Sequence, residues 1–268
     1  MPQTRQTAIP INKNLVQLED LPQSVIAYGR DLDKGDILPF HSHRRAQLVY
    51  ASNGVMAVTT RTASYVVPPL RAVWMPGGVE HQIDARSAVS MRTLYIDVQE
   101  AAGLPDVVCV LQVTPLLREL IVEAVTTGPG YESDSPQSRI MAVILDQIRS
   151  QPVASLALPI PSDPRLRRLV QLLISNPADS RSLDEWAGEV GASKRTLVRL
   201  FRAQTGMTFR DWRQQRRLHR ALELLTTGET VTSIALEVGY DNTSAFIAMF
   251  RRCLGTTPMR YLNITEQP

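Results

Sequence analysis

The chain has 268 residues and a net charge of +3, with 29 Lys and Arg residues against 26 Asp and Glu residues. This length predicts two domains, each large enough to bury its own core. Two cysteines are too few for a disulfide framework, and no stretch of about 18 uncharged apolar residues occurs, which excludes a disulfide-rich secreted domain and a membrane-spanning helix.

The first 14 residues are polar and are predicted to form a loose arm. They contain Pro2 and Pro10 and lack the apolar segment of a signal peptide. Without a secretion signal, Cys109 and Cys253 are interpreted as ordinary thiols in a reducing compartment. We therefore expect a cytoplasmic protein with no membrane partner.

Short runs of β-type sequence occupy residues 24–98. The runs are rich in β-branched and aromatic residues, and turn pairs such as Asn53-Gly54 separate them. The expected strands cover residues 47–51, 54–60, 64–67, 72–75 and 91–98. Several strands at this spacing predict an all-β sandwich or barrel.

Three of the four histidines lie in this β-rich segment. His41 and His43 stand two residues apart where a strand is expected to begin, so alternation predicts both imidazoles on one face. His81 follows the pair Gly77-Gly78, which is expected to form a tight turn. The three side chains could bind a metal ion together, or they could line a pocket and hydrogen-bond an organic ligand.

This segment resembles the cupin barrel. The first cupin motif is matched at Gly35, His41, His43 and Gly54, with Gln47 in the position of the usual glutamate. The second motif is matched at Pro76, Gly78 and His81, with Leu70 and Ala85 where glycine and asparagine are usual. The resemblance implies an effector-sensing and dimerising barrel, with a metal or effector site at His41, His43, Gln47 and His81.

Three imidazoles and one amide oxygen are a ligand set that suits a borderline divalent ion such as Zn, Ni or Fe. The amide of Gln47 is uncharged and is therefore a poorer ligand than the carboxylate it replaces. The predicted cofactor is one such divalent ion in the cupin site, and the alternative is a site without metal that hydrogen-bonds a small molecule.

The middle of the chain predicts two amphipathic helices, at residues 114–127 and 135–150. Their apolar stripes consist of Leu117, Leu120, Ile121 and Ala124 in the first helix and Ile140, Val143, Ile144 and Ile148 in the second. We expect a homodimer held either by the barrel or by the second stripe. Residues 152–164 contain four prolines, which predicts a stiff linker or a strand on the barrel. This divides the chain into an N-terminal sensing domain at residues 1–160 and an all-α domain at residues 161–268.

Charge is divided between the two halves. From Pro164 onward there are 16 Lys and Arg residues against 10 Asp and Glu residues, a net charge of +6, whereas the preceding part has a net charge of −3. Most of the basic residues in the second half are arginines, which suit bidentate contacts with phosphate and guanine. The basic half is therefore predicted to bind nucleic acid.

Two segments of the basic half share one layout, a helix, a glycine turn and a second helix. They cover residues 182–206 and 231–261, with turns at Gly191 and Gly239 and a long helix at residues 210–226 between them. This layout is that of the helix-turn-helix, whose second helix enters a DNA major groove. Two packed helices of an ordinary bundle are the alternative. The predicted DNA-binding residues are Lys194, Arg195, Thr196, Val198, Arg199 and Arg202 in the first segment and Asn242, Thr243, Ser244, Ile247 and Arg251 in the second.

These hundred residues resemble the DNA-binding domain of the AraC/XylS family of bacterial transcription regulators. The second segment matches at Ile234, Ala235, Gly239, Tyr240, Ser244, Phe246, Phe250, Arg251, Arg252, Gly255 and Pro258, and the first at Leu183, Ala187, Ser193, Leu197, Arg199, Phe201 and Gly206. One departure concerns base contacts, because Ile247 and Ala248 face outward where relatives often have arginine or glutamine.

The resemblance implies a sequence-specific transcription regulator, either an activator or a repressor, that responds to a small molecule or metal. Its two helix-turn-helix units would occupy adjacent major grooves of operator DNA, and RNA polymerase would be a partner of an activator. The alternative is a cupin metalloenzyme fused to a DNA-binding domain. Glu80 is the only obvious carboxylate beside a candidate ligand, so we expect a protein that is not an enzyme and has no catalytic residues.

Overall fold

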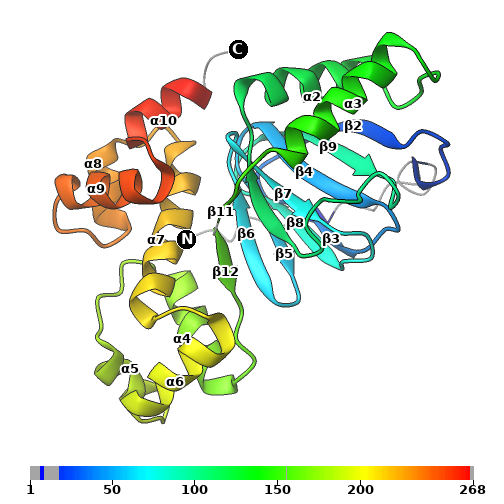
Figure 1. The fold of residues 1–268 in the computed structure, drawn as a ribbon. Helices are drawn as coiled ribbons and strands as arrows, with labels where there is room; N and C mark the ends of the chain where they lie inside the picture. The colour runs from blue at the N-terminus through cyan, green and yellow to red at the C-terminus, as the bar shows by residue number, and fades with distance from the viewer. Residues whose placement is uncertain (1–6, 9–17, 155, 266–268) are drawn as a thin grey trace. The chain divides into compact units, whose positions relative to one another are not determined.

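The computed structural model describes residues 7–8, 18–154 and 156–265 (Figure 1). The chain divides into two compact units, residues 1–61 with 65–157 and residues 62–64 with 158–268. We call them the N-terminal and C-terminal units, and the separate functions predicted for residues 1–160 and 161–268 stay a prediction. Of the expected arm at residues 1–14, only Thr7 and Ala8 are among the described residues. No helix in the described ranges is long and apolar enough to cross a membrane.

The strands form two six-stranded sheets, in the orders β1-β3-β8-β5-β6-β12 and β11-β10-β7-β4-β9-β2. The first contains β1 (Thr7–Ala8), β3 (Asp36–His41), β5 (Met56–Thr60), β6 (Ala63–Val67), β8 (His81–Ala85) and β12 (Ala157–Pro159). The second contains β2 (Val25–Leu32), β4 (Ala46–Asn53), β7 (Arg71–Met75), β9 (Val89–Ile96), β10 (Cys109–Gln112) and β11 (Val153–Ala154). The expected all-β architecture of this part is confirmed.

The position expected for the paired histidines was wrong. His41 is the last residue of β3, and the next strand, β4, begins only at Ala46. His41 lies opposite His81, the first residue of β8, after an irregularity in the β3–β8 register between Leu38 and His41. The pairing of β3 with β8 therefore brings His41 and His81 together, and His43 follows in the loop before β4.

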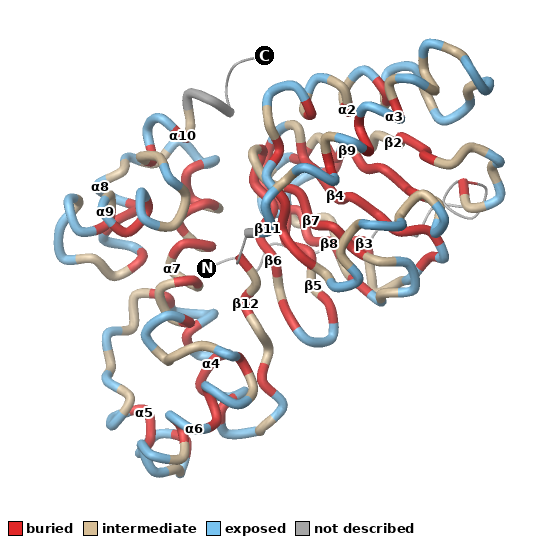
Figure 2. Tube along the Cα trace, in the orientation of Figure 1, coloured by how far each residue is buried: buried red, intermediate tan, exposed pale blue. Residues whose placement is uncertain are grey.

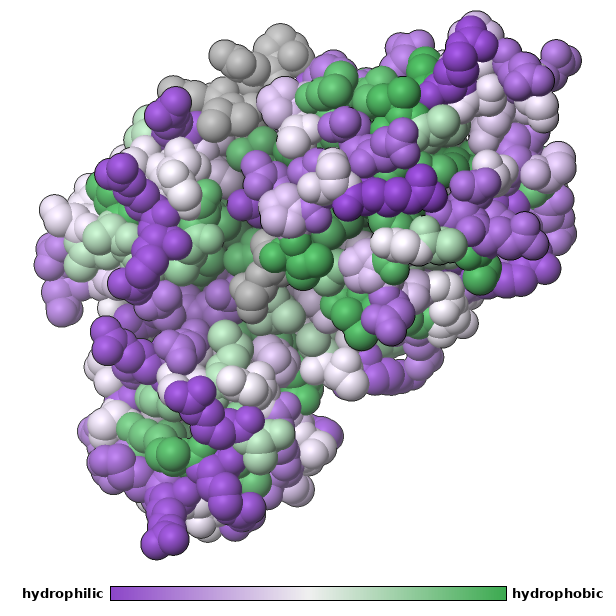
Figure 3. Space-filling model, viewed as in Figure 1, coloured by the Kyte–Doolittle hydropathy of each residue, from purple (hydrophilic) through white to green (hydrophobic). Residues whose placement is uncertain are grey.

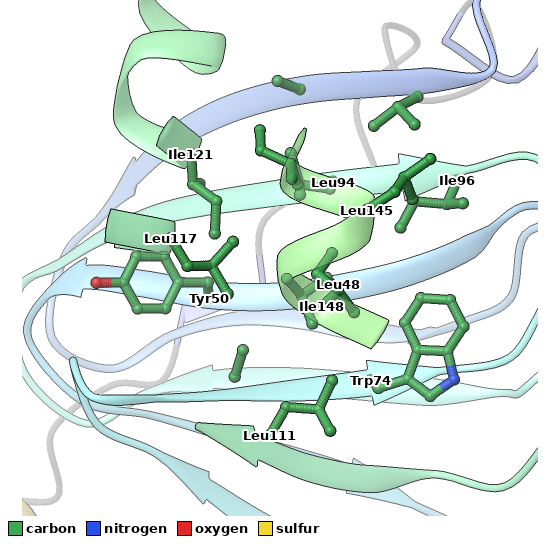
Figure 4. Close-up of a cluster of buried hydrophobic side chains, with 14 of the residues drawn as sticks. Leu48, Tyr50, Trp74, Leu94, Ile96, Leu111, Leu117, Ile121, Leu145 and Ile148 are labelled. Carbon is green, nitrogen blue, oxygen red and sulfur yellow. The ribbon is translucent and has the colours of Figure 1, made fainter. Parts of the chain in front are cut away.

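Strand β4 is buried on both faces. Leu48 and Tyr50 point outward from the second sheet into a core covered by α2 (Pro115–Thr127) and α3 (Pro136–Arg149) (Figure 4). Gln47 and Val49 alternate with them and therefore point to the opposite face of the sheet, where they are at most 1% exposed. The strand thus separates an apolar helix-covered layer from the side on which the histidines lie.

Both middle helices begin where they were expected. Thr114 and Ser135 cap them through side-chain oxygens that accept backbone hydrogen bonds, and a proline follows each cap. The buried face of α3 consists of Met141, Ile144, Leu145 and Ile148. The predicted stripe was wrong in part, because Val143 is 43% exposed. Ile144 and Ile148 are at most 1% exposed within the core of this chain, so these two residues are not free to contact a second copy.

The C-terminal unit is helical, and each helix has one buried side (Figure 2). Its helices are α4 (Pro164–Ser175), α5 (Leu183–Glu189), α6 (Lys194–Thr205), α7 (Phe209–Leu225), α8 (Val231–Glu237), α9 (Thr243–Leu254) and α10 (Pro258–Thr265). One core gathers α4, α5, α6 and the start of α7 around Trp186, Phe201 and Trp212. Aromatic contacts join Phe246, Phe250 and Tyr261 of α9 and α10. The predicted two-part fold is confirmed.

Candidate functional site

His41, His43 and His81 converge at one end of the sheets. The rings of His41 and His81 are 4.3 Å apart between centroids, and those of His43 and His81 are 5.2 Å apart. One nitrogen of each ring lies within 4.8 Å of those of the other two. His81 is fully buried and His43 is 9% exposed, so the cluster lies largely out of water.

Each of these rings is oriented by a backbone carbonyl. The Nδ1 atoms lie 2.8 Å from Pro39 O for His41, 2.7 Å from Arg45 O for His43 and 2.9 Å from Val79 O for His81. A carbonyl oxygen only accepts, so Nδ1 carries the hydrogen in all three rings and donates it. In a neutral ring this leaves the lone pair on Nε2, which is the tautomer that histidine metal ligands require.

The amide of Gln47 has its orientation set by Thr93. Its Nε2 donates to Thr93 Oγ1 at 2.9 Å, and the Thr93 hydroxyl in turn donates to Leu48 O at 3.0 Å. Because that hydroxyl hydrogen is already used, Thr93 acts only as an acceptor toward Gln47. The amide oxygen consequently points at His43, with Oε1 3.0 Å from Nε2.

This contact places two acceptors face to face when His43 is neutral. Such a pair is repulsive unless a proton or a cation lies between or beside the two atoms. The Nε2 atoms of His41 and His81 are also buried and have no hydrogen-bond partner in the described part of the chain. The Nε2 atoms of His41 and His81 are thus without a donor, and when His43 is neutral its Nε2 and the Gln47 oxygen lack one as well.

Burial keeps two of the rings uncharged. It lowers the pKa of His81 to about 3, with smaller contributions from the neighbouring histidines, and it also lowers the pKa of His41. Both are therefore neutral at pH 7 and able to donate electron pairs. No carboxylate joins the three histidines within ligand distance in the described residues. Glu80 instead forms an exposed ion pair with Arg61, with 2.7 Å between Oε2 and Nε.

Thr93, which orients Gln47 and is fully buried, was not among the predicted site residues. Its position in a strand was predicted, but its role depends on the register that places Gln47 opposite Tyr95 and Leu48 opposite Leu94. Tyr95 was missed too, and its ring meets that of His43 edge-on at 5.1 Å. A strand register between β4 and β9 has no local sequence signal that would have revealed either residue.

The pair α5 and α6 has the predicted helix, turn and helix. Gly191 adopts a positive φ of 66° in the turn, and Ser193 caps α6 by accepting from Thr196 N. Leu197, Leu200 and Phe201 are buried, and the opposite side of the helix is exposed. Hydrophilic side chains predominate around α5 and α6 on the face drawn in Figure 3.

The exposed side of α6 carries free arginines. The side chains of Arg195, Arg199 and Arg202 are exposed and form no hydrogen bond or ion pair with any described residue, and Val198 between them is 48% exposed. Lys194 differs, because its Nζ lies 2.6 Å from Asp184 Oδ2. Of the predicted α6 residues, Thr196 is partly buried and its hydroxyl lies 2.9 Å from that of Ser193, whereas the others are exposed. One of the four cations is already paired.

The pair α8 and α9 repeats the layout. Gly239 has a φ of 83° in the turn, and Asn242 caps α9 through Oδ1, which accepts from Ala245 N at 2.8 Å. Ser244 and Arg251 are exposed, whereas Ile247 is partly buried. Thr243 contacts Thr232 through their hydroxyls at 3.4 Å. The exposed face of α9 therefore carries fewer charged groups than that of α6.

Comparisons with known proteins identify both units. Residues 25–158 match the family model described as an AraC-like ligand binding domain, and residues 186–264 match a helix-turn-helix domain. The transcriptional regulator NimR of Escherichia coli K12 is 39% identical over 224 residues, which cover 84% of this chain and 82% of NimR. The regulator RipA of Corynebacterium glutamicum is 40% identical over 103 residues, 38% of this chain and 31% of RipA. The arabinose operon regulatory protein of Salmonella typhimurium is 30% identical over 152 residues, 55% of this chain and 53% of that protein.

Proposed function

Because the chain belongs to the AraC family of transcription regulators, we propose that its two helix-turn-helix units insert α6 and α9 into adjacent major grooves of double-stranded operator DNA. The observation that carries this proposal is the free arginine face of α6, on which Arg195 and Arg199 stand four residues apart. Side chains at this spacing project from one side of a helix, and a guanidinium can bond guanine O6 and N7 together.

The other predicted contacts are assigned by their exposure. Arg202, in the last turn of α6, and Arg251, in the last turn of α9, suit phosphate contacts that position the protein without selecting a sequence. Thr196, Val198, Thr243, Ser244 and Ile247 are the remaining candidates for base or sugar contacts. Lys194 and Asn242 contribute only after releasing the partners that they hold in this structure.

The histidine cluster is proposed as the place where the signal enters. The residues fit a divalent ion such as Zn, Ni or Fe, because one ligand nitrogen of each histidine lies within 4.8 Å of the other two, the Nε2 atoms of His41 and His81 have no partner among the described residues, and the Gln47 oxygen lies 3.0 Å from Nε2 of His43. In that role His41, His43, Gln47 and His81 would hold the ion, which would supply a Lewis-acidic position for an effector. A small molecule with convergent N–H or O–H groups is the other ligand that satisfies these acceptors.

The regulator is proposed to be a homodimer and not an enzyme, with RNA polymerase as a partner where it activates. A cupin metalloenzyme fused to a DNA-binding domain would need a general acid or base beside the histidines. Glu80, the carboxylate considered for that role, is exposed and paired with Arg61, which favours the regulator. Linking two binding domains in a dimer raises their effective concentration on a repeated operator.

Selection of DNA from a random duplex pool by the purified full-length protein tests the proposal. The expected product is a sequence with two conserved boxes about one helical turn apart. Arg199→Ala is expected to lower preference for the selected duplex over random DNA, whereas Arg202→Ala is expected to lower affinity for both. Selection of no sequence at all would contradict the proposed function.

A further inference from the structure

Three arginines of α7 hold the connection between α4 and α5. Each guanidinium donates to one backbone carbonyl: Arg213 to Arg181 at 3.0 Å, Arg216 to Ile174 at 3.0 Å and Arg217 to Pro177 at 3.0 Å. The arginines stand at positions i, i+3 and i+4 and therefore share one face of α7. We call these three residues the arginine brace.

The carbonyls that the brace contacts otherwise lack a helical partner or stand in a loop. Ile174 lies in the last turn of α4, where carbonyl oxygens are left without intrahelical hydrogen bonds and a cation is favoured by the helix dipole. Arg216 places its guanidinium there with only 11% of its side chain exposed. Charge-assisted hydrogen bonds shielded from water in this way are the stronger kind.

The α4–α5 connection is itself fixed to the first helix-turn-helix unit. Arg181 lies over the ring of Trp186 in α5 at 3.7 Å, and its guanidinium pairs with Asp179 at 2.8 Å. Trp186 is fully buried in the core that contains α6. A contact that fixes the position of the α4–α5 connection therefore also fixes the position of α6.

The α4–α5 connection also lies against the turn between α8 and α9, in the second helix-turn-helix. A Cβ added to Gly239 would lie 2.8 Å from both Cα and O of Ala178, and 2.7 Å from Nη2 of Arg217. The guanidinium of Arg217 also lies over the ring of Tyr240 at 5.4 Å. Arg217 therefore contacts Pro177, next to the first helix-turn-helix, and Tyr240 of the second helix-turn-helix.

We propose that the arginine brace fixes the separation and rotation of α6 relative to α9, and so makes the spacing between the two DNA boxes a determinant of specificity. This inference rests on the proposed function. Adding one base pair between the boxes moves the second box by about 3.4 Å along the duplex and rotates it by roughly 34°. Two helices held rigidly cannot follow this change, so the DNA must deform instead.

The test measures the loss of affinity caused by one inserted base pair, with the full-length protein and the duplex that it selects. For the wild-type chain we expect the insertion to weaken binding at least about tenfold. For the double variant Arg216→Ala/Arg217→Ala we expect a loss of less than about threefold, because the second unit can then reorient. A lower affinity for the uninterrupted duplex alone does not count as support, since any destabilised variant could show it.

Arg220→Ala is the matched control. Arg220 lies on the same helix and joins it to α8 through Glu237, and it shares Glu223 with Arg216, but it bonds none of the carbonyls of the α4–α5 connection, so this control separates the brace from the other arginine contacts of α7. The Arg220→Ala variant should lose as much affinity as the wild type when one base pair is inserted, a loss that we call the spacing penalty. If circular dichroism shows that the double variant has lost its helices, Arg217→Lys replaces it, because lysine keeps the charge but not the planar fork. Its spacing penalty should again be smaller than that of the wild type.

Three outcomes would overturn the inference. Failure of the wild-type chain to select any sequence would remove the proposed function and this inference with it. If the wild-type chain selects a two-box duplex but the Arg216→Ala/Arg217→Ala variant shows the same spacing penalty as the wild type, the role of the brace is refuted and the proposed function stands. A wild-type chain that tolerates the insertion would show that the two helices are not held at a fixed spacing.

Discussion

Replacing Thr93 by valine tests whether the side chains around the three histidines are arranged to bind a cation. Valine keeps the shape of threonine but removes the hydroxyl that accepts from Gln47 and donates to the Leu48 carbonyl. Thr93 is fully buried, so bulk water does not replace the lost partner. The Gln47 amide then loses the contact that directs its oxygen at His43.

The expected magnitude follows from the contact that is lost. A buried polar group left without a partner costs about 1–3 kcal/mol, and each 1.4 kcal/mol is tenfold in affinity. Removing a group that orients a metal ligand typically lowers metal affinity about 10- to 100-fold. We therefore expect Thr93→Val to weaken Zn²⁺ binding by about 10- to 100-fold, and His81→Ala to weaken it further because a ligand itself is removed.

Competition with a chromogenic chelator at pH 7 measures these affinities on the full-length protein. The control is Ser52→Ala, which also removes a hydroxyl from the second sheet, one that donates to Ser90 O at 3.3 Å away from the histidines. It should leave Zn²⁺ affinity unchanged. Equal affinities for Thr93→Val and the wild type would refute the role of Gln47 as a ligand. A wild-type chain that binds no Zn, Ni or Fe would refute the metal and leave an organic effector as the ligand of the pocket.

Three further predictions concern DNA preference, folding and assembly. Arg199→Ala should reduce the ratio of specific to random DNA affinity by about 5- to 150-fold, which corresponds to the loss of one bidentate guanine contact of about 1–3 kcal/mol. Arg202→Ala should instead lower both affinities equally. Equal losses on both DNAs in the Arg199 variant would contradict the prediction. In urea denaturation, Gly239→Ala should lower the free energy of unfolding by about 1–3 kcal/mol more than Gly255→Ala does. Both glycines have a positive φ, but of the two only Gly239 has backbone atoms where a Cβ would lie. Equal losses of stability in the two variants would refute the close approach of Ala178 to Gly239. The full-length protein should be a dimer by light scattering at micromolar concentration. Ile144→Ala should lower the melting temperature, because it leaves an internal cavity, and the variant should remain a dimer. An Ile144→Ala variant that is monomeric but as stable as the wild type would contradict the internal position of Ile144.

The sequence predicted the elements that have strong local signals. Ser193 and Gly191 mark the start and turn of the first helix-turn-helix by a cap and a left-handed glycine, and both do so in the structure. The proline after Thr114 likewise placed the start of a helix correctly. Such signals depend on residues within one or two turns, and they need no knowledge of the rest of the fold.

The features that were missed depend on contacts between distant segments. The buried face of α3 was predicted correctly at Ile144 and Ile148 but wrongly at Val143, because Ile and Val occur around much of the helix and the sheet against which it packs decides which of them are buried. The orientation of Gln47 depends on Thr93, 46 residues away. The brace was missed for the same reason, since Arg216 and Ile174 are 42 residues apart and arginines on a helix usually remain in solvent.

The proposed binding of α6 and α9 to adjacent major grooves is tested most directly by a hydroxyl-radical footprint of the full-length protein on the duplex that it selects. Two recognition helices on one rigid unit should protect two segments on the same face of the DNA, with centres about 10–10.5 base pairs apart. Insertion of one base pair should weaken the protection of one segment while the other remains. A single protected segment, or protection that is independent of sequence, would contradict the claim that α6 and α9 bind adjacent major grooves.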